Sequence, residues 1–215
     1  MTTSGARTAL LACGAVALDV ATLVERRGWN ADVHGISSDL HMTPLDIAPA
    51  VERKLERLVP RYDRVIVVYG DCGTGGRLDA VLERYPAARP AGVHCFEWYS
   101  GDVYRRFSQD IGIYFLTDWL VDNWDRAVVR GLGLDRFPWL KDTYFDNLTR
   151  ILFVRQHPDA EREAKAREIA AWIDRPLEIH DLGIEPLERL LAPLVEEPSE
   201  RSNQPTGDED ADVRT

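Results

Sequence analysis

The chain has 215 residues, of which 45% are hydrophobic and 29% charged, a composition typical of soluble globular proteins. Its net charge of −10 gives no support for nucleic-acid binding, which requires a basic surface. No apolar stretch approaches the ~20 residues that span a bilayer. The apolar segment 8–20 is short and contains Cys13 and Asp19. We therefore expect a cytoplasmic protein without a signal peptide or membrane segment.

Short apolar segments alternate with helical patterns along the chain. Strands are expected at residues 8–12, 31–36, 65–69, 91–95, 111–116, 151–156 and 177–180. Helices are expected at residues 15–27, 44–58, 78–85, 102–109, 118–131, 140–148, 160–173 and 185–195. This alternation predicts a single Rossmann-like or flavodoxin-like α/β domain over residues 1–195, with a mainly parallel sheet flanked by helices.

The last segment, 196–215, has a different composition. It contains seven acidic residues and two Arg, and Val213 is its only large apolar residue. Such a segment cannot bury enough apolar surface to fold, so it predicts a disordered acidic tail.

All three cysteines fall where a predicted strand ends. Cys13 follows the first strand, Cys72 follows the third, and His94 and Cys95 end the fourth. Ligands of open parallel sheets bind beyond the carboxyl ends of the strands. A strand order of 2-1-3-4 would make these three strands neighbours, with the outer two ~10 Å apart. An order of 3-2-1-4-5-6 would separate them, so the site hypothesis also predicts the topology.

Three thiolates would leave one position of a metal open for a substrate. Zinc fits this pattern, and so does an iron–sulfur cluster held by Cys13, Cys72 and Cys95. Calcium and magnesium prefer oxygen ligands. The spacings match no short zinc-binding motif. The alternatives are buried structural thiols, a redox or nucleophilic cysteine, and a disulfide between the first two cysteines.

The residues around Cys72 and Cys95 supply further candidates. Gly73, Thr74, Gly75 and Gly76 form either a nest of backbone N–H groups for an anionic ligand or a tight strand-to-helix turn.

Three side chains near the strand ends are candidates for moving protons. His94 is either a fourth ligand, an acid or base, or a core histidine. Glu97 and Asp118 are candidate general acid/base groups, with a helix cap as the alternative for Asp118. His41, His157 and Asp181 are weaker candidates at the same edge.

Several blocks of the sequence resemble an uncharacterised bacterial and archaeal family, labelled as a domain of unknown function. They read A-C-G-A, Y-G-D-C-G-T-G-G, H-C-F-E-W-Y-S-G, F-L-T-D and L-G-L-D, and the resemblance covers about residues 8–193. Its members are often encoded near corrinoid-dependent methyltransferases. The resemblance therefore implies a role in methylamine or related one-carbon metabolism, with the motif cysteines at Cys13, Cys72 and Cys95.

Three functions follow as expectations. The first is a cytosolic metal- or iron–sulfur-dependent lyase or transferase acting on a small anionic substrate. The second is a non-catalytic accessory protein that carries a metal, cluster or corrinoid for a methyltransferase partner. The third is a metal-free binding module for a phosphate-bearing ligand.

Overall fold

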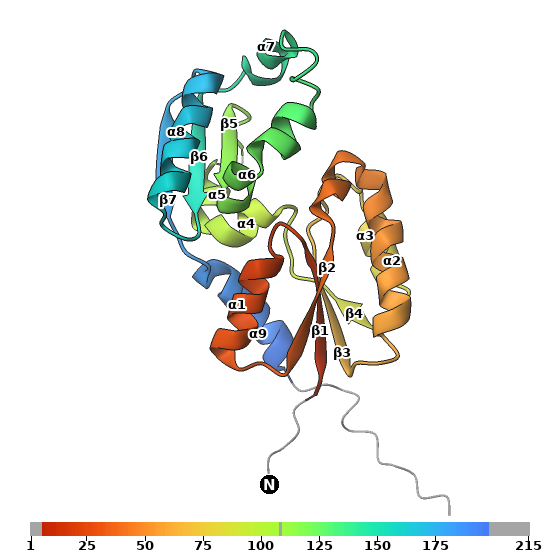
Figure 1. The fold of residues 1–215 in the computed structure, drawn as a ribbon. Helices are drawn as coiled ribbons and strands as arrows, with labels where there is room; N and C mark the ends of the chain where they lie inside the picture. Colours follow the sequence, from red (N-terminus) through yellow and green to blue (C-terminus); the bar gives the residue numbers. More distant parts are fainter. Residues whose placement is uncertain (1–5, 108, 198–215) are drawn as a thin grey trace, which may run out of the picture.

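A computed structural model describes residues 6–107 and 109–197 of the chain. These residues form two parallel sheets, each flanked by helices (Figure 1). The first sheet has the order β2-β1-β3-β4 and the second the order β5-β6-β7. The predicted α/β class and the predicted order 2-1-3-4 are confirmed. The separate second sheet is a feature that the sequence did not predict, and the single domain over residues 1–195 stays a prediction.

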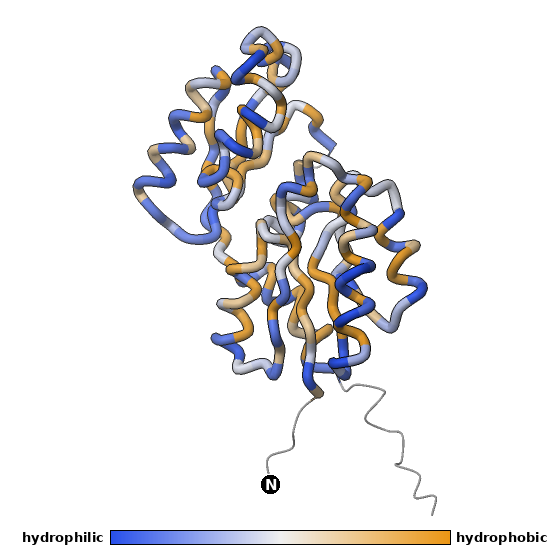
Figure 2. Tube along the Cα trace, turned by 45° about the vertical axis from the view of Figure 1, so that its right-hand side comes forward, coloured by the Kyte–Doolittle hydropathy of each residue, from blue (hydrophilic) through white to orange (hydrophobic). Residues whose placement is uncertain are grey.

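The first sheet is built on two apolar strands. Its strands are β1 (Thr8–Cys13), β2 (Ala31–Ile36), β3 (Arg64–Val68) and β4 (Ala87–Ala88). In the parallel register, Leu10 of β1 pairs with Val33 of β2 and Ile66 of β3. Every residue of β1 is buried, as are four of the five in β3, because helices cover both faces. Figure 2 shows the hydrophobic residues concentrated along these strands.

The predicted fourth strand at residues 91–95 is wrong. The strand β4 comes earlier, at Ala87–Ala88, and Cys95 is the first residue of helix α4. Pro90 cannot donate a ladder hydrogen bond, and Gly92 has a φ of +123°, so the chain leaves the extended conformation between them.

The helices of the first sheet come from both ends of the chain. Helices α1 (Ala17–Arg27) and α9 (Glu185–Glu196) lie on one face, and α2 (Ile47–Leu58) and α3 (Arg77–Leu82) on the other (Figure 1). Two short 3-10 turns, η1 (Ser38–Met42) and η2 (Pro44–Asp46), connect β2 to α2. Arg26 of α1 pairs with Glu185 of α9 at 3.3 Å, and Arg64 donates to the carbonyl of Leu194 at 2.7 Å. Helix α9 is therefore held against the first sheet.

The second sheet consists of β5 (Ile113–Thr117), β6 (Arg150–Arg155) and β7 (Leu177–Asp181). Its helices are α6 (Asp118–Asp122), η3 (Asp125–Arg130), α7 (Leu140–Phe145) and α8 (Ala160–Ile173). The hydroxyl of Thr117 accepts from the N–H of Leu120 and caps α6. The single helix predicted at 118–131 is instead divided into α6 and a π-helix, η3.

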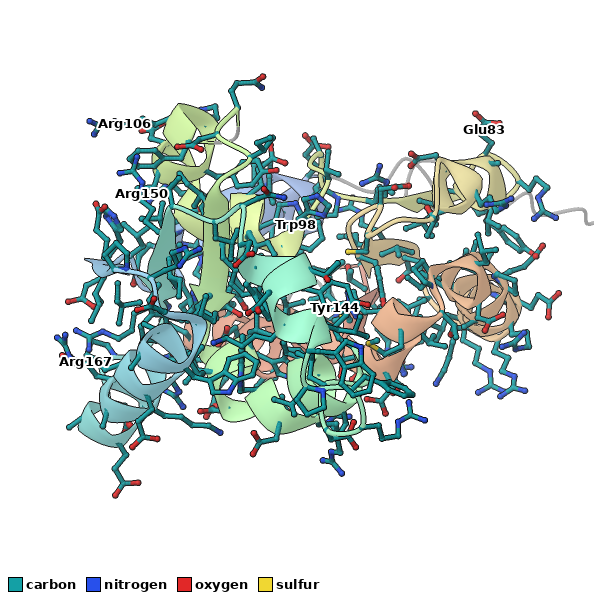
Figure 3. All side chains as sticks on the ribbon, turned by 90° about the horizontal axis from the view of Figure 1, so that it is seen from above. Glu83, Trp98, Arg106, Tyr144, Arg150 and Arg167 are labelled. Carbon is teal, nitrogen blue, oxygen red and sulfur yellow. The ribbon has the colours of Figure 1, made fainter. Side chains whose placement is uncertain are left out.

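Helix α4 (Cys95–Ser100) lies between the sheets, and α5 (Asp102–Phe107) follows it beside the second sheet, where the ring centroids of Tyr104 and Phe115 of β5 lie 5.4 Å apart. Phe96 of α4 stacks on Phe115 of β5, with ring centroids 6.1 Å apart, while Trp98 is buried in the core of the first sheet. Figure 3 shows Trp98 near the middle of the molecule and Arg106, Arg150 and Arg167 at its periphery. Helix α4 thus connects the first sheet to the second and packs against both.

No helix in residues 6–107 and 109–197 is long and apolar enough to cross a membrane. Most of the predicted acidic tail lies outside the described residues. Its first residue, Glu196, instead ends α9 and accepts a hydrogen bond of 2.9 Å from the indole of Trp29.

Candidate functional site

The three cysteines come together from three segments of the chain. Cys13 ends β1, Cys72 lies in the turn after β3, and Cys95 begins α4. Strands β1 and β3 are hydrogen-bonded neighbours, so the first two cysteines share one edge of the sheet. All three are free, and they lie close enough together that the charge of Cys13 raises the pKa of Cys72, and the charges of Cys72 and Cys13 raise the pKa of Cys95. This convergence agrees with the strand order from which it was predicted.

A close backbone crossing brings Cys95 to the other two. The N–H of Cys72 donates to the carbonyl of Val93 at 3.2 Å. A Cβ added to Gly70 would lie 2.5 Å from that same carbonyl oxygen, so only glycine fits at the crossing. Cys72 itself has a φ of +46°, a strained conformation for a residue with a side chain. The backbone therefore holds the turn against residues 91–95 at some energetic cost.

Burial dominates the chemistry of the three thiols. It raises the pKa of Cys13 and of Cys95, and together with the nearby charges of Cys13 and Asp71 it raises the pKa of Cys72 to about 12. The N–H of Ala15 donates to the sulfur of Cys13 at 3.4 Å and opposes the shift. Near neutral pH and without a bound cation, the three side chains are therefore protonated thiols.

Tyr69 interacts with all three cysteines. Its side chain is 0% exposed, and its hydroxyl forms no hydrogen bond of regular geometry with any described residue. The hydroxyl interacts with the Cys13 thiol, and burial and the three thiols raise the pKa of Tyr69 far above its usual range. A buried hydroxyl without a partner costs about 1–3 kcal/mol. It is a group for which a ligand could supply the missing partner.

His41 is the aromatic neighbour of Tyr69. The two rings are stacked with centroids 5.6 Å apart and planes at 19°. Nδ1 of His41 lies 2.7 Å from the carbonyl oxygen of Ser38, which can only accept, so Nδ1 carries a proton. In the neutral ring Nε2 is then free to accept a proton.

A cavity of about 310 Å3 opens beside this group, between the first sheet and the helices of the second. Cys95 and His41 line it from the first side, and Trp119 and Arg126 from the second. Most of the remaining lining is apolar, including Met42. The volume is that of a small-molecule site, which typically has about 300–1,000 Å3.

The two sides of the cavity are joined by a pair of charges. The guanidinium of Arg126 in η3 donates to the carboxylate of Asp39 in η1, and also to the amide oxygen of Asn123 at 2.9 Å. A second link, away from the cavity lining, is the 2.7 Å contact between Nε2 of His157 and Asp19. Both links connect helices of one sheet with segments of the other.

The glycine turn holds an anion that belongs to the chain. The carboxylate of Asp71 accepts from the hydroxyl of Thr74 and from the N–H groups of Gly75 at 3.3 Å and Gly76 at 3.0 Å. These donors hold the pKa of Asp71 below its usual value, with the Thr74 bond as the largest cause. An external anion at this nest would have to displace Asp71. The N–H and hydroxyl donors of the predicted anion site therefore already bind a carboxylate of the chain. Gly73, with a φ of +87°, gives the turn its shape.

The predicted acid/base residues have different surroundings. His94 is half-buried next to α4, and burial lowers its pKa while Glu97 and Asp71 oppose the shift. The carboxylate of Glu97 accepts from the N–H of Val93 at 2.9 Å and so caps the start of α4. Neither residue lines the 310 Å3 cavity.

Asp118 connects β5, β6 and α8. Its carboxylate accepts from the N–H of His157 at 2.8 Å and from Arg162 at 3.2 Å, and burial raises its pKa. Asp181, at the end of β7, forms an ion pair with Arg155. These contacts give both carboxylates a structural role at the edge of the second sheet.

Within residues 6–107 and 109–197, no group of three or more His, Cys, Asp or Glu side chains has an arrangement that could hold a metal ion as it stands. The ligand roles of Cys13, Cys72 and Cys95 therefore stay predictions.

Comparison with known protein families gives a match. A model of the family DUF1638, described as a protein of unknown function, matches residues 36–191. The chain belongs to the DUF1638 family. This agrees with the resemblance to a family of unknown function, although the DUF1638 match begins after β1 and therefore includes Cys72 and Cys95 but not Cys13. No curated protein matches the sequence.

The sequence did not identify Tyr69 as a site residue, and it gave His41 only as a weaker candidate. Tyr69 follows the buried β3 run directly and precedes the glycine turn, so its place at the carboxyl end of β3 was a usable signal. His41 lies in the polar segment after β2, at the same edge of the sheet.

Proposed function

We propose that this DUF1638 protein is a metal- or iron–sulfur-dependent enzyme that uses Cys13, Cys72 and Cys95 as its ligands and binds a small substrate in the 310 Å3 cavity. The observation that carries the proposal is the convergence of three thiols on a buried hydroxyl, that of Tyr69, which has no regular partner among the described residues.

The donor set fits a soft metal. Thiolates select zinc, copper(I) or iron–sulfur clusters, and three of them leave one position for a substrate. The present rotamers do not form a metal-binding group. A change of χ1 moves a cysteine sulfur while the backbone stays in place, so binding requires new rotamers in at least one of the three. Because the thiols have raised pKa values, binding must also release protons and tighten as the pH rises.

The chain's own residues supply the rest of the site. A bound metal would contribute Lewis acidity at its open position. Nε2 of His41 lies at the cavity and can accept a proton, since Nδ1 is held by Ser38. The largely apolar walls exclude water, and Arg126 is the guanidinium that lines the cavity, available to an acidic group of the substrate if it leaves Asp39.

Anaerobic purification followed by metal analysis and a UV–visible spectrum tests the proposal. We expect about one metal ion or cluster per chain, and broad absorbance near ~400 nm if it is iron–sulfur, because zinc is colourless. Cys13→Ser, Cys72→Ser and Cys95→Ser should each lower the metal content several-fold. His157→Gln is the control. His157 contacts Asp19 away from the cavity, so its replacement should leave the metal content unchanged.

Metal-free protein with three titratable thiols would contradict the proposal, and so would metal that stays bound in all three cysteine variants. A methylamine or one-carbon substrate and a corrinoid methyltransferase partner remain expectations from the resemblance. Turnover by the isolated metal-loaded protein would distinguish an enzyme from an accessory carrier.

A further inference from the structure

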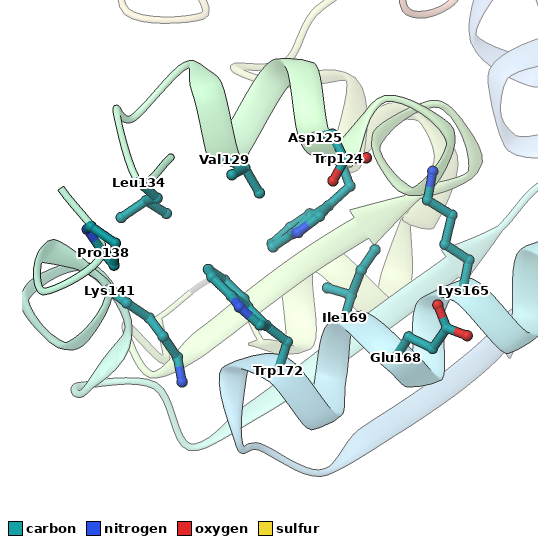
Figure 4. A pocket seen from close by; sticks show the side chains of 10 residues that line it. All are labelled: Trp124, Asp125, Val129, Leu134, Pro138, Lys141, Lys165, Glu168, Ile169 and Trp172. Atoms are coloured by element: carbon teal, nitrogen blue, oxygen red, sulfur yellow. The ribbon is translucent and has the colours of Figure 1, made fainter. Parts of the chain in front are cut away.

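A second cavity lies on the second-sheet side of the molecule, lined by helices and by the segment between η3 and α7. Its volume is about 500 Å3, and it opens between η3, the segment before α7, and α8 (Figure 4). None of the thiols lines it. An inference about this cavity is therefore independent of the proposed metal site.

Two indole rings form its centre. Trp124 precedes η3 and is 5% exposed, whereas Trp172 of α8 is 38% exposed at the cavity. Their rings meet edge to face, with centroids 6.0 Å apart and planes at 80°. Ile169 and Val129 add apolar walls. Aromatic faces of this kind suit a flat ring, which gains stacking as well as the burial of apolar area.

Two ammonium groups stand on opposite sides of the indoles, as Figure 4 shows. Nζ of Lys141 lies 5.3 Å from the centre of the Trp172 ring, and Nζ of Lys165 donates to the carbonyl of Asp122 at 3.2 Å. Neither ammonium forms an ion pair with a carboxylate in the described part of the chain. Both lysines are therefore free to take an anionic partner, and both are partly buried along the cavity.

The carboxylates of the cavity lie in a different environment. Asp125 and Glu168 also line it, but both residues are exposed, whereas both lysines are partly buried. Water screens the exposed carboxylates more strongly than it screens the half-buried ammonium groups. The less screened charges at this cavity are therefore the positive ones, although the whole chain carries −10.

The wall of the cavity is also unusual in its backbone. Helix η3 (Asp125–Arg130) is a π-helix, a rare form that is often found at functional sites. Asp125 and Val129 of η3 line this cavity, while Arg126 and Val128 line the 310 Å3 cavity. The wide helix is therefore the partition between the two cavities.

We propose that this second cavity is a binding site for a planar aromatic molecule that carries an anionic group. The ring lies against Trp124 and Trp172, and Lys141 or Lys165 binds the anionic group. An aromatic carboxylate and a phosphorylated heteroaromatic compound both belong to this class.

Two fluorescent probes test the proposal on the full-length protein. 8-Anilinonaphthalene-1-sulfonate is anionic, and N-phenyl-1-naphthylamine is its uncharged counterpart. We expect the sulfonate to bind, and Trp172→Leu to weaken both probes. The double variant Lys141→Met/Lys165→Met should weaken the sulfonate about tenfold or more, the effect of losing a charge-assisted contact, and the neutral probe less than about twofold.

Two controls assign the binding to this cavity. Trp119→Leu changes the same residue type in the 310 Å3 cavity, and Lys54→Met removes an ammonium from α2; both should leave sulfonate binding unchanged. Circular dichroism spectra would check that each variant is folded. The proposal is overturned if the wild type binds no sulfonate, if the double lysine variant weakens both probes equally, or if Trp119→Leu rather than Trp172→Leu abolishes binding.

Discussion

The ring of His41 stacks on the ring of Tyr69, with centroids 5.6 Å apart, and the Tyr69 hydroxyl beneath it is buried among three thiols. This contact joins the loop after β2 to the end of β3. It places a residue able to accept a proton next to a hydroxyl that lacks a regular partner in the described structure.

Removing the Tyr69 hydroxyl should stabilise the metal-free protein. Tyr69→Phe deletes a buried polar atom without a regular partner, so we expect the free energy of unfolding to rise by about 1–2 kcal/mol. Tyr99→Phe is the matched control. It should lower the free energy of unfolding, because the Tyr99 hydroxyl donates a hydrogen bond to Asp19. Urea denaturation measures both, and a loss of stability in Tyr69→Phe would show that its hydroxyl has a partner.

Alkaline pH should destabilise the metal-free protein. Burial raises the pKa of Cys72 to about 12 from an ordinary value of 9.0, so folding favours the protonated thiol. Its contribution is complete below about pH 9 and is lost as the pH rises toward about 12. Denaturation midpoints measured across this range should fall more steeply in the wild type than in Cys72→Ala, and equal slopes would contradict the prediction.

The turn after β3 should depend on Asp71. Asp71→Ala leaves the N–H groups of Gly75 and Gly76 without their acceptor, so we expect a loss of about 1–2 kcal/mol. The pKa of Asp71 is lowered in the folded protein, so its contribution is present above about pH 4 and is lost as the pH falls further. Urea denaturation at neutral and acidic pH would test this, since Asp71→Ala should remove part of the acid sensitivity. Asp79→Ala, at an exposed ion pair with Arg89, is the control for a carboxylate outside the turn.

The ion pair between Arg126 and Asp39 should control access to the 310 Å3 cavity. Both side chains are substantially exposed, so Arg126→Met should change the free energy of unfolding by less than about 1 kcal/mol. Alkylation of Cys95, which lines the cavity, should nevertheless become faster when the link is lost. Peptide mass spectrometry measures the rate of alkylation, with Arg130→Met as the control on the same helix. Equal rates in the two variants would show that the ion pair does not control access to the cavity.

Much of the first sheet could be predicted because its signals are local. The apolar runs of β1 and β3 are long enough to be read as buried strands, and the helices between them force a parallel arrangement. The division into two sheets depends on a contact between distant residues. Phe96 of α4 packs on Phe115 of β5, so a helix lies where one continuous sheet would need a strand. Such a contact leaves no periodic signal in the sequence.

The candidate site could be predicted in part for the same reason. Parallel strands share their carboxyl edge, so the positions of Cys13 and Cys72 followed from the topology. Cys95 reached the group by another route, at the start of a helix that Gly70 allows to approach. The role of Asp71 could also have been predicted, because an Asp side chain before a glycine-rich turn often accepts hydrogen bonds from the backbone of that turn. The stacking of His41 on Tyr69 depends on tertiary packing and could not be read from the sequence.

X-ray absorption at the metal edge of anaerobically loaded protein tests the central claim most directly. For zinc, the account predicts three sulfur ligands from the chain and one fewer in Cys72→Ser; for an iron–sulfur cluster, it predicts a first shell of sulfur around iron and loss of the cluster in Cys72→Ser, with His157→Gln unchanged in both cases. A first shell of nitrogen and oxygen alone, or a sulfur count that Cys72→Ser leaves intact, would contradict it.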